Sequence, residues 1–279
     1  MVLMTAARAT AAPRRYRIPR YLRPRPRTVL GMTSSAWTVA LGLLCVVTLE
    51  TVSRAGLISD LYLVPPSTMA TRAASLVTDG GFLRQDLLPS VALIAVTFAV
   101  AGLLGIATAY LLWRSDWCRR AALPWLAVYY AIPVFAIYPC LVVLFGVGPV
   151  PILVVSVAFG TVVVVTNTLT GFDSVPQPVV KLARARRLGA GQYLRRILLP
   201  AAAPDILAGL RLGLVYSIIG VLATEFILST HGLGHYIADA YHTFRVTDMY
   251  AGILLICVVA LVLNVGSATV AGRLDWRRR

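Results

Sequence analysis

The sequence predicts an all-α membrane protein, a bundle of six transmembrane helices. Its composition, its long apolar blocks and the placement of its basic residues point to this class. Of 279 residues, 58% are hydrophobic and only 13% are charged, whereas a soluble domain carries about 25% charged residues. A soluble enzyme is therefore excluded. The six blocks that are long enough to cross a bilayer, which takes about 20 helical residues, are Ala36–Ile58, Leu88–Trp113, Ala121–Phe145, Gly148–Thr170, Asp205–Leu228 and Asp248–Gly272.

Each block is expected to be helical, because unpaired backbone groups are too costly in hydrocarbon. The first contains only two charges, Glu50 and Arg54, at the spacing of a helical ion pair. After it, Pro66 and Ser67 resemble a helix start, and Gly80-Gly81 should end a short helix along the outer surface. The third block is aromatic and carries prolines, so a kinked helix is expected there.

The remaining blocks begin at recognisable boundaries. Glycines and prolines separate the third block from the fourth, which starts at Gly148. Pro204 with Asp205 has the form of a helix start for the fifth block, and Asp248 supplies an acidic first turn for the sixth. These boundaries complete the six predicted helices.

The basic residues predict the orientation of the bundle. Links and tails on one side carry 21 Lys and Arg residues, while those on the other side carry three. The positive-inside rule then places both termini in the cytoplasm, an N-in/C-in topology. Residues 1–35 form a basic Pro/Arg-rich cytoplasmic tail that helps to fix this topology, with contact to anionic lipid as the alternative. Residues 36–279 form the transmembrane domain.

No catalytic chemistry is expected of the chain itself. Its single lysine, Lys181, lacks the glycines and the Ser or Thr of a phosphate-binding loop, so any ATP use must come from a partner. No nucleophile–base set or metal cluster appears in the sequence. The basic residues lie between apolar blocks, which argues against a nucleic-acid partner. No cofactor bound by this chain is expected.

The inner link 171–204 is the most distinctive segment, because it is far longer than an ordinary helix connection. It contains two helix-like pieces. Val179–Leu188 carries a basic stripe, and Gln192–Leu199 carries an apolar face that Pro200 should end. A basic, amphipathic element on the cytoplasmic face serves either as a docking device or as a surface anchor on lipid, and both alternatives stay open on physical grounds.

Several motifs in order resemble those of a known family. Arg187-Leu188-Gly189-Ala190 and Arg196-Ile197-Leu198-Leu199-Pro200 are similar to the cytoplasmic EAA loop of ABC importer permeases. Downstream, Ala223-Thr224-Glu225-Phe226 and Gly232-Leu233-Gly234 resemble the nitrate/sulfonate/taurine branch of the binding-protein-dependent type I importers. The resemblance covers the chain from about Glu50 onward.

This resemblance implies a multi-pass permease subunit in the bacterial inner (plasma) membrane. Its partners would be ABC ATPase subunits that bind ATP and Mg, an extracytoplasmic substrate-binding protein, and a second copy or a related permease in the bilayer. The solute would be small and polar or anionic, such as a sulfonate, taurine, nitrate or a vitamin precursor. A stand-alone secondary transporter or channel and a non-transport scaffold are the alternatives. The residues implied to couple to the ATPase, within 181–200, are Arg184, Ala185, Arg187, Gly189, Ala190, Ile197, Leu199 and Pro200.

The loop departs from the family pattern in two ways. The position of the motif's glutamate falls on Ala183, and seven residues separate Gly189 from Ile197 where the family usually has nine. Two residues amount to about 200° of helical rotation. We therefore expect this permease to need a matched ATPase.

Five residues are candidates for the translocation path or gate. Tyr130 and Tyr138 belong to the aromatic third block, which could line a path, and Glu225, Gly232 and Gly234 lie near the outer end of the fifth block. Glu225 is an ionisable group near the end of a span, and such groups are functional candidates. The alternative is an interfacial carboxylate bonded to a loop or to another helix. The glycines suit a tight turn that re-enters the edge of the bilayer, and they argue against a helical metal site at the neighbouring histidines.

Overall fold

The structure, a computed structural model, describes residues 34–56, 62–129 and 132–274, and these residues form helices joined by short links. The helices are α1 (Ser34–Arg54), α2 (Pro66–Thr78), α3 (Gly80–Phe82), the π-helical turn η2 (Leu83–Leu87), α4 (Leu88–Arg114), α5 (Asp116–Tyr129), α6 (Val134–Phe145), α7 (Pro149–Asp173), α8 (Gln177–Ala185), α9 (Ala190–Tyr193), the π-helical turn η3 (Leu194–Leu198), α10 (Leu199–Leu228), α11 (Leu233–His242) and α12 (Val246–Leu274). The all-helical prediction is confirmed for the described residues. Of the predicted tail 1–35, all but the last two residues lie outside the described ranges.

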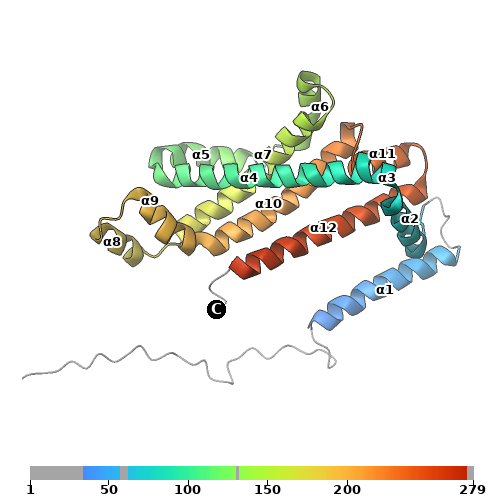
Figure 1. Cartoon of the computed structure of the whole chain (residues 1–279), viewed down its shortest axis with the longest axis horizontal. Coiled ribbons are helices and arrows are strands. Elements are labelled where there is room, and N and C mark those ends of the chain that lie inside the picture. Colours follow the sequence, from blue (N-terminus) through green and yellow to red (C-terminus); the bar gives the residue numbers. More distant parts are fainter. Residues whose placement is uncertain (1–33, 57–61, 130–131, 275–279) are drawn as a thin grey trace, which may run out of the picture.

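Five helical stretches are long and apolar enough to cross a membrane, and α5 with α6 makes a sixth if that bent pair is one span. Figure 1 shows the start of α1 and the end of α12 pointing toward the end of the molecule where α8 and α9 lie. Helix α1 therefore begins, and α12 ends, on the same side of the bundle. Which side faces the cytoplasm, and whether the spans number six, remain predictions.

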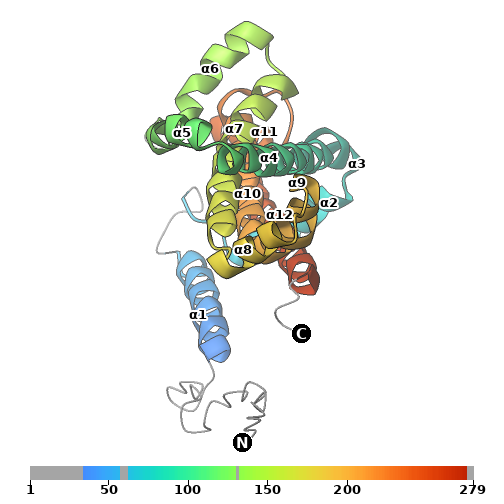
Figure 2. The same cartoon turned by 90° about the vertical axis from the view of Figure 1, so that its left-hand side faces the viewer.

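Helices α4, α7 and α10 form the centre of the bundle, where α7 contacts both of the others and lies beside α10 beneath α4 (Figure 2). Val164 of α7 is fully buried there. An added Cβ at Gly105 of α4 would lie 2.6 Å from the Val164 Cβ, and one at Gly213 of α10 would lie 2.7 Å from a Val164 methyl. Glycine thus lets both helices approach α7 closely, as is usual where helices pack inside membranes.

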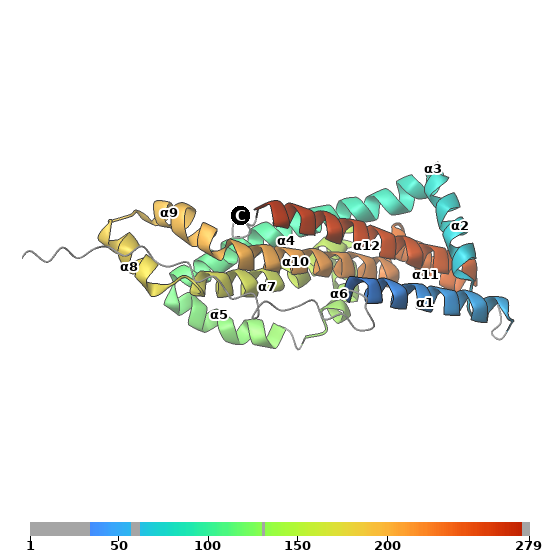
Figure 3. The ribbon, with the colours of Figure 1, turned by 90° about the horizontal axis from the view of Figure 1, so that it is seen from below.

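The elements at one end of the molecule are short helices: α2, α3 and α11 gather there, opposite α8 and α9 (Figure 3). Phe82, Leu233 and Leu255 belong to one buried cluster that holds these helices to α12. The predicted helix start at Pro66 agrees with α2. Gly80-Gly81 was expected to end the short helix. In the structure α2 ends earlier, at Thr78, and Asp79 accepts a hydrogen bond from the Gly81 N–H at 2.9 Å. The two glycines therefore begin the next helix, α3.

The inner link also differs from its prediction. Pro200 does not end the second helical piece, because the helix continues from η3 into α10, which begins at Leu199 rather than at Asp205. A proline in the first turn of a helix is tolerated, and the wide π turn before it removes the need for its missing N–H. The first piece, α8, ends at Ala185, before the predicted end at Leu188.

The third predicted span is broken. Instead of one kinked helix over Ala121–Phe145, the chain forms α5 and α6, which are bent relative to each other by 96°. Pro133 immediately precedes α6 and accounts for its start, since proline disfavours a helical residue before it. Figure 2 shows α6 rising away from the central helices, and α1 also stands apart from them.

Candidate functional site

The inner loop turns one face of α8 toward the bundle and the other to the outside. Ala183, at the position of the family's glutamate, is only 3% exposed. Leu182 is 58% exposed, and Lys181, Arg186 and Arg187 are exposed as well. Within the described residues no carboxylate lies within ion-pair distance of these three cations. The outward face of the loop is therefore basic with an apolar residue at its centre.

Arg187 follows α8 in a backbone conformation that favours glycine, with φ of +50°. The Leu188 N–H donates to the Ala183 carbonyl at 3.2 Å, which closes the end of the helix around this residue. Arg184 and Ala185 lie in the last turn of α8, Gly189 is exposed in the link to α9, and Ala190 is exposed at the start of α9. The coupling residues predicted before position 191 thus lie on one projecting element.

The second half of the loop is anchored on the bundle. The Tyr193 ring stacks on Trp113 of α4, with ring centroids 5.9 Å apart and planes 14° from parallel. Leu198 is fully buried, and Ile197 and Leu199 are half-buried. Between α4, α8 and α9 lies a cavity of about 360 Å³ with Ala183 in its wall. Ile197, Leu199 and Pro200 therefore connect the exposed element to α10.

At the predicted outer end, Glu225 is 2% exposed and forms part of a clamp on the first turn of α11. Its carboxylate oxygens lie 2.7 and 2.8 Å from the Ser90 hydroxyl, which donates to the carboxylate. The Gly234 N–H donates to the same carboxylate at 3.0 Å. The Leu233 N–H donates to the Ser90 hydroxyl at 2.8 Å, and the Gly232 N–H to Asp86 at 3.2 Å.

Three successive N–H groups of α11 are therefore satisfied by side chains from η2, α4 and α10. Ser90 and Asp86 were not among the predicted site residues. A serine within an apolar span ordinarily bonds to its own helix backbone, so its sequence context gave no sign of this role. We call Glu225, Ser90 and Asp86 the outer clamp.

Two glycines allow this close approach. Gly232 has φ of +106°, and an added Cβ there would lie 2.5 Å from the Glu225 carboxyl carbon. A Cβ on Gly234 would lie 2.7 Å from the Glu225 Cβ. The tight turn expected at these glycines is present, and it leads directly into α11, which contains His235 and His242 but not His231. The described residues contain no group of three His, Cys, Asp or Glu side chains that could hold a metal ion.

The fourth gate candidate in this region is Tyr138 of α6, which is fully buried. Its hydroxyl donates to the Leu228 carbonyl at 2.8 Å and ties α6 to the end of α10. The structure thus brings Tyr138, Glu225, Gly232 and Gly234 together around the junction of α10 and α11, whereas Tyr130 lies outside the described residues. Beside this junction is a cavity of about 570 Å³, lined by apolar residues of α4 and α7, by Glu225 and by the link from Ser229 to His231.

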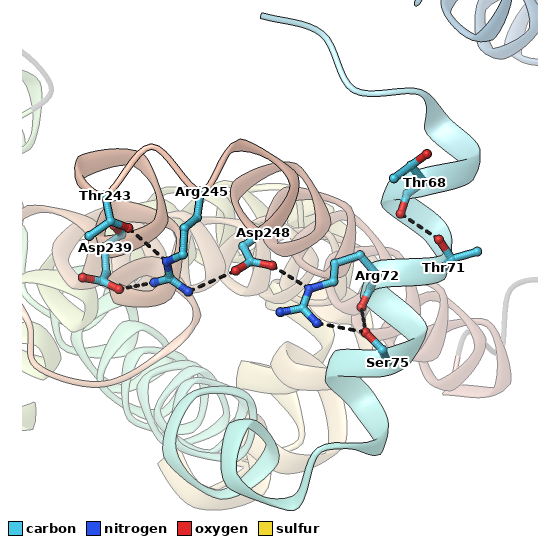
Figure 4. A network of polar contacts seen from close by, with 8 residues as sticks. All are labelled: Thr68, Thr71, Arg72, Ser75, Asp239, Thr243, Arg245 and Asp248. Carbon is cyan, nitrogen blue, oxygen red and sulfur yellow. Dashed lines mark hydrogen bonds and ion pairs between the residues drawn. The ribbon is translucent and has the colours of Figure 1, made fainter. Parts of the chain in front are cut away.

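A chain of ion pairs fixes the outer short helices (Figure 4). Asp248 at the start of α12, only 8% exposed, binds Arg72 of α2 at 2.6 Å and Arg245 at 3.0 Å. Arg245 also pairs with Asp239 of α11. The hydrogen bond from Arg72 to Asp248 raises the pKa of Arg72 above its usual value. The sequence did not predict this network. Asp239, Arg245 and Asp248 lie close together in the chain, but their partner Arg72 comes from a distant segment.

Comparison with known proteins identifies the architecture. Residues 101–279 match the family described as binding-protein-dependent transport system inner membrane component. The taurine transport system permease protein TauC of Escherichia coli is 31% identical over 229 residues, 80% of this chain and 83% of TauC. The nitrate import permease protein NrtB of Synechocystis is 32% identical over 188 residues, 67% of this chain and 68% of NrtB.

A solved structure has the same fold. An inward-facing form of the MetNI methionine ABC transporter superposes with a TM-score of 0.61 at 16% identity, covering 69% of this chain and 95% of the compared chain. These matches exclude the two alternatives, a stand-alone transporter and a non-transport scaffold. In this family ATP hydrolysis belongs to a separate subunit. The chain belongs to the family of binding-protein-dependent transport system inner membrane components and is the membrane-spanning permease subunit of an ABC importer.

Proposed function

We propose that this permease imports a small polar or anionic organic solute across the bacterial inner membrane and couples to its ATPase through loop 181–200. Relatives named for taurine, nitrate, bicarbonate and riboflavin transport support the solute class. A second permease copy or a related permease, two ATPase subunits that bind ATP and Mg, and an outer substrate-binding protein complete the transporter.

The observation that carries the coupling role is the division of the loop into two parts. The outward part, with exposed Leu182, Arg186 and Arg187, has no carboxylate partner among the described residues and is available to the ATPase. The inward part is fastened to the bundle by the Tyr193–Trp113 stack and by buried Leu198. A displacement of α8 by the ATPase would therefore be transmitted to α4 and α10 rather than absorbed by the link.

The opposite end of α10 carries the proposed gate. Glu225 and Tyr138 lie near the end of this helix and join it to α11 and α6 respectively. A movement of α10 that starts at the inner loop would change both contacts and thereby open or close the cavity beside them. In this proposal Glu225 positions α11 and does not bind the solute, since both of its oxygens are engaged by Ser90 and Gly234.

Co-purification of the ATPase with the full-length permease tests the coupling loop. The variant Arg186→Glu/Arg187→Glu reverses the charge of two exposed residues of the outward part. We expect the ATPase, identified by mass spectrometry, to accompany the wild type in mild detergent and to be lost from the variant. Arg120→Glu, an exposed basic residue at the same end of the bundle, is the matched control and should retain the ATPase.

Two outcomes would contradict this proposal. Retention of the ATPase by both variants would move the contact away from loop 181–200. Loss of the ATPase from the Arg120→Glu control as well would mean that net charge, and not this surface, determines the association.

A further inference from the structure

The turn between α11 and α12 exposes an aromatic side chain in an unusual backbone conformation. Phe244 has φ of +55°, and its side chain is 80% exposed. The left-handed region is unfavourable for residues with a Cβ and is common only for glycine and asparagine. A bulky residue here costs stability, and its exposed ring recovers little of that cost by packing within the chain.

The backbone around Phe244 closes α11 in the way that normally selects glycine. The Arg245 N–H donates to the Ala240 carbonyl at 2.8 Å, and the Thr243 N–H donates to the Asp239 carbonyl at 2.9 Å. In such helix ends the residue in the left-handed conformation is usually glycine. Phenylalanine in that position is therefore better explained by a contact outside the chain than by folding.

The turn has a fixed base. Arg245, the residue after Phe244, pairs with Asp239 and Asp248, and Asp248 binds Arg72 of α2 (Figure 4). The Arg245 guanidinium also lies 6.0 Å from the centroid of the Tyr236 ring. These contacts hold the turn from three helices, so Phe244 projects from a rigid support. A preorganised side chain loses less entropy when it binds.

Phe244 has aromatic neighbours in sequence that are also accessible. Tyr241 is 59% exposed, and its ring contacts exposed His242 with centroids 5.4 Å apart. We call Tyr241, His242 and Phe244 the outer aromatic patch. Charged side chains border it, with Asp239 and Arg245 each nearly half exposed. An aromatic centre within a polar border is the usual composition of a protein-binding hot spot.

We propose that the outer aromatic patch is a docking surface for the substrate-binding protein of this importer, with Phe244 as the anchor that enters an apolar pocket on that protein. The proposal rests on the proposed function. The patch lies at the end of the bundle opposite α8 and α9 (Figures 1 and 3). The distribution of basic residues predicts that this end faces the outside of the cell, where the binding protein is found. The family itself is defined by dependence on a binding protein.

The substitution Phe244→Gly separates docking from folding, because it removes the ring and the backbone strain together. We expect a transporter with higher thermal stability but weaker docking. The experiment uses the permease–ATPase complex in proteoliposomes, titrated with the solute-loaded substrate-binding protein that stimulates its ATP hydrolysis. The concentration for half-maximal stimulation should rise about tenfold, the effect of losing one hot-spot side chain. Phe244→Trp, which keeps an aromatic ring, should stay within about threefold of the wild type.

Trp117→Ser is the matched control. Trp117 is 77% exposed, much like Phe244, but it lies at the start of α5 near the opposite end of the bundle. The concentration of binding protein that gives half-maximal stimulation of ATP hydrolysis should be the same in Trp117→Ser as in the wild type. An unchanged concentration in Phe244→Gly would overturn the docking proposal while leaving the permease function intact. Absence of any ATPase from the wild-type complex would instead overturn the proposed function and this inference with it.

The bilayer is the competing neighbour of an exposed ring. If Phe244 rests in the lipid headgroups, brominated lipids will quench the additional emission of Phe244→Trp relative to the wild type without binding protein. Such quenching, together with unchanged stimulation in Phe244→Gly, would assign the ring to the membrane and overturn the proposal. Absence of quenching, together with an emission shift that occurs only when binding protein is added, would support the docking proposal.

Discussion

Ser90 is the residue on which the outer clamp depends most, because its hydroxyl serves as donor and acceptor at once. It donates to Glu225 and accepts from the Leu233 N–H. Ser90→Ala leaves a buried carboxylate and a buried amide each short of a partner, and each such loss costs about 1–3 kcal/mol. We expect a total loss of about 2–6 kcal/mol in unfolding by denaturant in nanodiscs, and faster hydrogen exchange at the first turn of α11.

The control for this prediction is Ser217→Ala. Ser217 is also fully buried, but its hydroxyl donates to the Gly213 carbonyl of its own helix. Removal of that hydroxyl should cost about 1 kcal/mol or less and leave α11 protected from exchange. Equal losses in the two variants would mean that the clamp contributes no more than an ordinary buried serine.

Gly232 provides a second test of the clamp, because glycine has two separate reasons to occupy that position. Gly232→Ala imposes a left-handed backbone on alanine and drives a Cβ against the Glu225 carboxylate. Gly146→Ala imposes only the backbone cost, since Gly146 has φ of +79° with nothing within 4 Å of an added Cβ. We expect a loss of about 1–2 kcal/mol for Gly146→Ala and a clearly larger loss, with displaced α11, for Gly232→Ala.

Thermal unfolding of both glycine variants measures the difference directly. If the two variants lost the same stability, the close approach of Glu225 to the turn would not contribute to the free energy of unfolding. The sequence predicted Glu225 from its charge near a span end, Gly232 and Gly234 from a tight turn, and Tyr138 from the aromatic third block. It did not predict Ser90 or Asp86, because the partner of a buried hydroxyl is determined by helix packing, which local sequence does not encode.

The shortened inner loop leads to a prediction about whole elements. Seven residues separate Gly189 from Ile197, and we expect this spacing to give α8 a different rotational setting relative to α10 from that in a loop of the usual family length. We expect an ATPase from a relative with the longer loop to bind this permease but to hydrolyse ATP without stimulation by the binding protein. Insertion of two alanines after Gly191 should restore stimulation with that foreign ATPase and reduce it with the cognate one.

Reconstituted ATP hydrolysis with each pairing of permease and ATPase gives the readout. Two alanines inserted after Gly56, in the outer link that follows α1, form the length control and should leave both ATPases unaffected. Normal coupling of the unmodified permease to the foreign ATPase would disprove the need for a matched subunit.

At the level of helices, sequence patterns predicted the long apolar elements well and the breaks between them less well. The predicted start of the second span at Leu88 agrees with α4, and the fourth span differs by one residue at its start. Pro200 was expected to end a helix, but it lies in the first turn of α10. The same pattern, Leu-Arg, two residues, then Leu-Leu-Pro, occurs at Leu83–Pro89 and Leu194–Pro200, and both copies form a π turn that enters a long helix. This repetition was available in the sequence as a sign that proline here begins a helix rather than ends one.

The arrangement of the helices in the whole molecule could not be predicted from apolar periodicity, because lipid and protein interior are equally apolar. The three-helix centre instead depends on small residues whose positions become meaningful only when the partners are known. Gly105 and Gly213 approach Val164 from opposite helices, whereas Gly42 of α1 has nothing within 4 Å of an added Cβ. Glycine content alone does not distinguish these positions.

Substitution by leucine separates the two kinds of glycine. Gly105→Leu inserts a side chain where even a Cβ would lie 2.6 Å from Val164, so α4 must move away from α7. We expect a loss of more than about 3 kcal/mol, or failure to assemble, since overpacking alone costs about 1–3 kcal/mol and the contacts of two helices are lost with it. Gly42→Leu should leave stability unchanged within about 0.5 kcal/mol. Unfolding in nanodiscs compares the two variants, and equal stability would refute a centre built on close approach of α4 to α7.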